Sequence, residues 1–73
     1  MSITKTTMQM SLIKVLDSMN ISEESKVLIS LSLISDNQIG EFLYWLKDNI
    51  TDENMRVMED EICGRAIEIS KTI

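Results

Sequence analysis

Residues 34–47 of the chain read ISDNQIGEFLYWLK, and the first part of this stretch predicts the start of a helix. Ser35 is the expected N-cap, because its hydroxyl can accept a hydrogen bond from an amide in the first helical turn. Gln38 follows three residues later, where its side chain can reach back to the Ser35 amide and complete a capping box. Ile34 and Ile39 occupy the two ends of a hydrophobic staple. The chain is therefore expected to turn a sharp corner just before this helix.

The second part of the stretch, EFLYWLK, holds five apolar side chains in succession, which point in different directions around a helix. One arc of the helical wheel holds the side chains expected to face the core, namely Ile39, Phe42, Leu43, Leu46 and Ile50. Tyr44 and Trp45 lie outside that arc, on opposite flanks. They either cover the edges of the chain's own core or anchor an interface with another chain. Gly40 lies beside Tyr44, and in the second case it lets another backbone approach.

Two more helices are expected before this stretch. Residues 5–19 have one apolar face and residues 1–4 are expected to be frayed; the face consists of Met8, Leu12, Val15, Leu16 and Met19. Ser22 is the expected N-cap of a helix that reaches about Ile34 and is apolar around most of its surface. Such a helix is predicted to be central and buried. Residues 29–33 also alternate like a strand, but no other segment offers a partner strand.

A fourth helix is predicted after Thr51, which repeats the capping signal, with Ile50 facing Met55 as a second staple. It is expected to run to about Thr72 with an apolar stripe of Met55, Met58, Ile62, Ala66, Ile69 and Ile73. On its opposite side lies a weaker apolar patch, which is either scattered surface residues or a second part of a partner surface: Val57, Gly64 and Ile67. Glu61 and Arg65 are spaced as a surface ion pair.

These patterns predict an all-α protein in which residues 1–73 form a single compact, four-helix bundle-like domain with short connections and the second helix central. The chain has no proline and two glycines, which favours helices joined by tight connections. A domain of 73 residues buries only about 60% of its unfolded surface, and small folds usually need a disulfide, a metal or a partner.

The composition argues against most catalytic chemistry. The chain has no histidine and one cysteine, Cys63, so it can form no internal disulfide and offers no zinc ligand set. Histidine-dependent nucleophilic catalysis is likewise excluded. We therefore expect no enzyme activity, no metal and no cofactor. A homo-oligomer, most simply a two-fold dimer, is the expected source of additional stability.

The formal net charge of −5 opposes nucleic-acid binding, because an acidic chain repels phosphate backbones. The N-terminal ten residues are polar and no apolar run approaches a membrane span, so we expect a cytoplasmic protein with no membrane contact. The leading hypothesis is a small non-enzymatic interaction or regulatory module that self-associates or docks on a larger protein.

Two alternatives remain open. One is a helix-turn-helix DNA-binding regulator built from residues 23–34 and 36–49, with Asn37 and Gln38 available to read adenine. The other is an acidic inhibitor that occupies the basic, nucleic-acid-binding groove of a partner protein.

Overall fold

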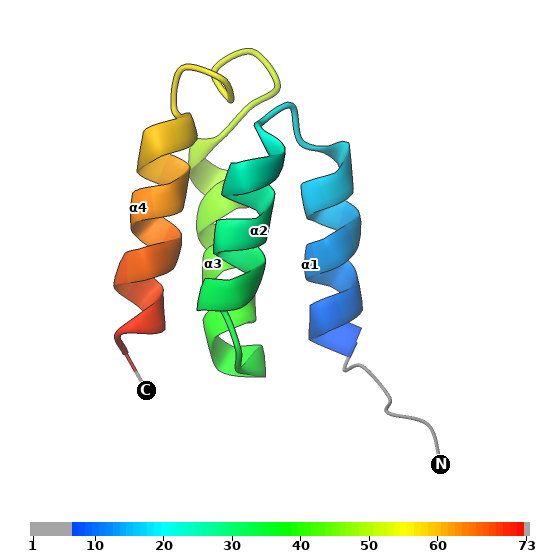
Figure 1. The fold of residues 1–73 in the computed structure, drawn as a ribbon, viewed down its shortest axis with the longest axis vertical. Helices are drawn as coiled ribbons and strands as arrows, with labels where there is room; N and C mark the ends of the chain where they lie inside the picture. The colour runs from blue at the N-terminus through cyan, green and yellow to red at the C-terminus, as the bar shows by residue number, and fades with distance from the viewer. Residues whose placement is uncertain (1–6, 73) are drawn as a thin grey trace.

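The computed structural model describes residues 7–72 and confirms an all-α fold. In this part of the chain four helices are present: α1 (Thr7–Ser18), α2 (Glu23–Ser32), α3 (Asp36–Asn49) and α4 (Glu59–Ser70). Successive helices run in opposite directions (Figure 1). Each helix packs against two others, in the order α1, α2, α4, α3 around the bundle. The consecutive helices α2 and α3 therefore occupy diagonal corners.

One hydrophobic core joins all four helices, and most of its members are those that the helical spacing predicts. The residues expected on the inner faces of α1, α3 and α4 are buried or half-buried against this core. Its buried members are Leu12, Leu16, Met19, Ile29, Leu33, Ile39, Phe42, Leu46, Ile62, Ala66 and Ile69. The predictions for residues 1–4 and for Ile73 lie outside the described residues.

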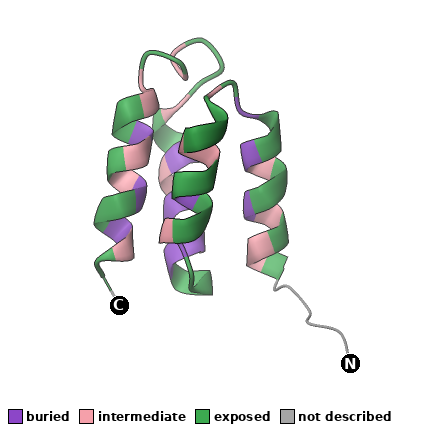
Figure 2. Cartoon of the chain, in the orientation of Figure 1, coloured by how far each residue is buried: buried purple, intermediate pink, exposed green. Residues whose placement is uncertain are grey.

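The helix predicted after Ser22 forms as α2, but it ends at Ser32 and its predicted burial on most sides is wrong. Within α2 only Ile29 is buried, whereas Val27 is 56% exposed and Leu31 is 73% exposed. Exposed residues accordingly line much of the visible side of α2 (Figure 2). The physical reason is the bundle geometry: α2 packs against α1 and α4 alone, so it is one of four corners and not a central element.

The sharp corner before α3 is closed by the predicted capping box. The Gln38 amide donates to the Ser35 hydroxyl over 3.2 Å, and the Gln38 side-chain oxygen accepts from the Ser35 amide over 3.2 Å. The same oxygen also accepts from the Ile34 amide over 3.1 Å. The staple is not formed as expected, because Ile34 is 75% exposed while Ile39 is fully buried.

Gln38 is buried, and its side chain also closes the far end of α4. Its Nε2 group donates to the Thr72 carbonyl over 2.8 Å and to the Ser70 carbonyl over 3.3 Å. The last carbonyls of a helix have no partner within the helix, and a buried amide needs partners for both of its ends. The Gln38 side chain thus provides hydrogen-bond partners for backbone groups at both the start of α3 and the end of α4.

The predicted start of the fourth helix at Thr51 is wrong, although the local capping signal is real. Thr51 and Asn54 exchange hydrogen bonds of 2.8 and 3.3 Å, as a capping box does. Residues 52–58 nevertheless form successive turns, and α4 begins at Glu59. Asn54 also donates to the Asn49 carbonyl over 3.3 Å, which folds this segment back on the end of α3.

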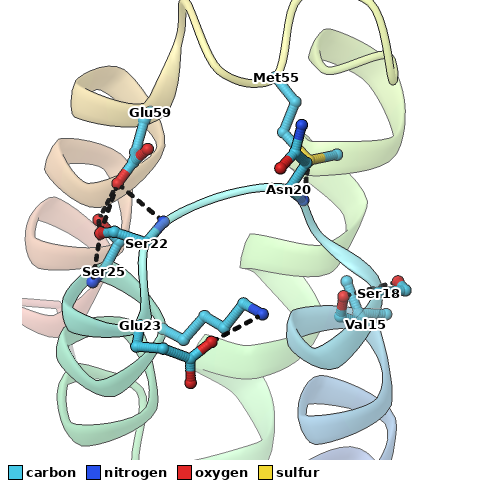
Figure 3. Close-up of polar contacts among 9 residues, drawn as sticks. Val15, Ser18, Asn20, Ser22, Glu23, Ser25, Met55 and Glu59 are labelled. Carbon is cyan, nitrogen blue, oxygen red and sulfur yellow. Dashed lines mark hydrogen bonds and ion pairs between the residues drawn. The ribbon is translucent and has the colours of Figure 1, made fainter.

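A second set of hydrogen bonds, which we call the Glu59 clasp, lies at the other end of the bundle. It joins the first turns of α2 and α4. The Glu59 carboxylate accepts from the Ser22 hydroxyl over 2.8 Å, the Ser25 hydroxyl over 2.5 Å and the Ser22 amide over 3.3 Å (Figure 3). The Ser25 bond, followed by the two Ser22 bonds, lowers the pKa of Glu59 from its ordinary value. These contacts fix where α4 starts beside α2.

Replacing Gln38 with glutamate is expected to destabilise the fold by about 2 kcal/mol or more, because a carboxylate would face two carbonyl oxygens with no proton to donate. Urea unfolding at neutral pH measures this loss. Part of it should be recovered as the pH falls, because burial beside carbonyl oxygens raises the pKa of the introduced glutamate and its protonated form can donate again. The matched change at the exposed neighbour, Asn37→Asp, is the control and should cost little. Equal losses in the two variants would contradict the role given to Gln38.

The Glu59 clasp predicts a specific loss of stability in acid. Because folding lowers the pKa of this carboxyl below 4.5, the clasp stabilises the fold above that pH and its contribution is lost as the pH falls through the folded-state pKa. Thermal unfolding of Glu59→Gln across the acidic range should therefore show a weaker pH dependence than the unmodified protein. Asp60→Asn is the neighbouring control. An identical pH profile for Glu59→Gln and the unmodified protein would disprove the assignment.

Candidate interaction surface

Trp45 lies at the edge of the chain's own core. It is half-buried, and its ring stacks on Phe42 with centroids 6.3 Å apart and an interplanar angle of 28°. The Arg65 guanidinium of α4 lies over the Trp45 ring, 6.0 Å from the ring centroid, at a distance where a cation attracts the ring. Arg65 pairs with Glu68 over 2.5 Å and not with Glu61 as predicted. Trp45 therefore already has partners within the bundle.

Tyr44 and Gly40, the other predicted contacts on α3, differ from each other in their surroundings. Tyr44 is 70% exposed and remains available to a partner. A Cβ atom at Gly40 would stand 3.2 Å from the terminal methyl of Met8, so this glycine makes room for a side chain of α1. The close approach that Gly40 permits is thus already used within the chain. Whether Tyr44 and Trp45 contact another molecule stays a prediction.

The second predicted patch is not a face of one helix. Val57 lies in the turns before α4 and is 87% exposed, so it cannot share a helical face with Gly64 and Ile67. Gly64 is exposed with open space around it, and Ile67 is at the margin of exposure. The cause is the late start of α4, which removes residues 52–58 from the expected helical register.

A further apolar surface lies on α1 and α2. We name it the α1/α2 face; it consists of Ile13, Val27 and Leu31, which are exposed and line one groove. Val27 and Leu31 are four positions apart and so are neighbours on the surface of α2. A groove runs between the two helices, and Ile13, Val27 and Leu31 share its lining. Contiguous apolar surface of this kind marks contact sites on soluble proteins.

The groove has an apolar floor and a charged end. Ser30 lines both sections of it, and the small side chain leaves a depression beside the exposed Leu31. Asp17 and Glu23 lie at the end nearest the α1–α2 connection, where Lys26 pairs with Glu23 over 3.2 Å. Figure 3 shows the Glu23 carboxylate and its ion pair beside this connection. The exposed Val27 and Leu31 thus form an apolar ridge along one side of this groove.

Cysteine and acidic side chains are the remaining groups with metal-binding or nucleophilic chemistry. Among residues 7–72 no three histidine, cysteine, aspartate or glutamate side chains are grouped to hold a metal ion. Cys63 is half-buried and free. A shallow pocket of about 280 Å³ lies between α1, α3 and residues 50–55, and its apolar lining carries Lys47 and Asp52 at the rim. Over the same residues no helix is long and apolar enough to cross a membrane.

The helical pattern misses this surface because it predicts a buried helix that contains Val27, Leu28 and Leu31. Their composition alone cannot distinguish a helix surrounded by its own chain from one that awaits another chain. The serines between these apolar residues argue against burial on all sides, because Ser30 and Ser32 are unusual on a helix that the core surrounds.

Comparison of this chain with protein-family models, with curated proteins and with solved structures found no match. The surface itself is therefore the basis for any functional inference.

Trp45→Ala is expected to lower the free energy of unfolding by about 2 kcal/mol, because it removes the packing on Phe42 and Arg65. Urea unfolding measures this change. Tyr44→Ala removes an aromatic ring of similar size from an exposed position and should cost less than about 0.5 kcal/mol. Equal costs in both variants would show that Trp45 does not belong to the core edge.

Proposed function

We propose that this protein is a small non-enzymatic interaction or regulatory module that works by burying the α1/α2 face against another protein chain. The observation that carries this proposal is the exposure of Val27 and Leu31 on α2. Helices in proteins are stabilised mainly by packing an apolar face. Because only Ile29 of α2 is buried, packing within the bundle adds little to the stability of this helix. A partner on the outer side would supply the missing burial.

Charge and composition support the same proposal. The polar residues around the face carry both signs, as the rim of an interface commonly does. The free thiol of Cys63 is compatible with a reducing compartment, and the cytoplasm remains the proposed location. Self-association is the simplest form of this activity, and docking on a larger protein is the other.

The DNA-binding alternative loses one of its supports in this fold. Gln38, one of the two side chains offered for reading adenine, is buried and bonded to Ser70 and Thr72. Asn37 remains exposed, but α3 carries Asp36 and Glu41 in its first half. The acidic-inhibitor hypothesis stays a prediction.

A photoreactive phenylalanine analogue placed at Leu31 tests the proposed surface in living cells that make the protein. We expect discrete crosslinked adducts from this position, because contact with a partner would hold the probe against it. The same analogue at Tyr44 is the matched control, since both residues are about equally exposed. Adding Val27→Glu should abolish the Leu31 adducts. Absence of adducts from Leu31, or adducts from Tyr44 alone, would overturn the proposal.

A further inference from the structure

We propose that the pocket between α1, α3 and residues 50–55 binds a small apolar α-amino acid. The pocket shares no lining residue with the groove of the α1/α2 face, so this inference is independent of the proposed function. Three observations carry it: the hydrophobic core reaches the surface in this pocket, hydrogen bonds tie its loop wall to the neighbouring helices, and its rim carries Lys47 and Asp52.

The hydrophobic core is incompletely covered at this pocket. Leu46 is 7% exposed and Met19 is 5% exposed, whereas the other buried apolar residues of the core are at most 3% exposed, and both side chains line the pocket. Half-buried apolar side chains that pack on the core complete the lining, namely Val15, Leu43, Ile50 and Met55. An apolar group that displaces water from this surface is therefore bound favourably.

The segment that connects α3 to α4 forms one wall of the pocket. Asn54 donates to the Asn49 carbonyl over 3.3 Å at the end of α3, and the Asn20 amide after α1 donates to the Met55 sulfur over 3.1 Å (Figure 3). The segment is thus tied to both helices that form the other walls. A pocket whose walls are already held in place costs less to fill, and the flexible Met19 and Met55 side chains can adjust to the ligand.

The volume and the charges of the pocket define the class of ligand. Its volume of about 280 Å³ lies near the lower end of small-molecule sites, so it fits a molecule of amino-acid size. Lys47 and Asp52 lie at the rim, and within residues 7–72 neither belongs to an ion pair.

An apolar α-amino acid matches both rim charges. Its carboxylate and its ammonium group are attached to the carbon atom that carries the side chain. With the side chain in the pocket, the carboxylate can face Lys47 and the ammonium group can face Asp52. A ligand with a single charge would be attracted by one of these residues and repelled by the other.

Titration of the intact, isotope-labelled protein with L-leucine tests the site by nuclear magnetic resonance. Amide signals of residues 15–19 and 43–55 should shift, whereas those of residues 27–31 on α2 should not. Glycine has no apolar side chain and is the control that should cause no such shift. The absence of shifts at millimolar leucine, or shifts confined to residues 27–31, would overturn the proposal.

Two analogues of leucine test the role of the charges. Isocaproate lacks the ammonium group and isoamylamine lacks the carboxylate, while both keep the apolar body. Each should bind about threefold more weakly than leucine, which is the effect of losing one exposed ion pair. Binding as tight as that of leucine by either analogue would rule out an amino acid as the ligand class.

Substitutions in the pocket test its position. Lys47→Gln should weaken leucine binding about threefold, whereas Lys71→Gln, the same change near the end of α4, should leave it unchanged. Ser18→Phe should abolish binding, because the exposed Ser18 lines the pocket and an aromatic ring at this position would occupy it. Circular dichroism confirms that each variant is folded. Undiminished leucine binding by folded Ser18→Phe, or equal effects of the two lysine changes, would contradict the assigned site.

Discussion

The hydrogen bonds of the Gln38 side chain are the constraint on which the arrangement of the bundle depends. Its oxygen accepts from the corner at Ile34 and Ser35, and its nitrogen donates to the end of α4 at Ser70 and Thr72. The corner turns the chain from α2 to the diagonally opposite α3, and the same side chain then holds α4 against that corner. A buried amide with partners at both ends permits few alternative positions of these segments, because each displaced helix would leave a polar group unpaired.

The Glu59 clasp complements this constraint at the opposite end of the bundle. It joins the first turns of α2 and α4, two helices that run in the same direction and are far apart in sequence. With Gln38 bonded near one end and Glu59 at the other, α4 is held at both ends. This explains why α4 starts at Glu59 although Thr51 carries a sound capping signal: the turns of residues 52–58 are needed to bring Glu59 to the serines.

The hydrogen bonds of Gln38 and of the Glu59 clasp also determine which apolar side chains remain exposed on the surface of the bundle. Since α4 packs on one side of α2 and α1 on another, none of the described helices covers the outer surface of α2. Val27 and Leu31 are exposed as a consequence, and with Ile13 they line the groove between α1 and α2. Tyr44 and Trp45 are adjacent in the sequence but differ in the fold. Tyr44 is exposed, whereas Trp45 packs at the edge of the core.

The sequence by itself determined the four helices, the corner at Ser35 and the inner faces of α1, α3 and α4, because these depend on local capping and on spacing within one helix. It also placed the capping box at Gln38. Only the tertiary structure decided the order of helices around the core, the late start of α4 and the exposed side of α2. Each of these depends on contacts between residues distant in sequence, such as Gln38 with Thr72 and Glu59 with Ser25. An apolar helix surface looks the same in sequence whether its own chain or another covers it, so the candidate surface could be recognised only after the helices were assembled.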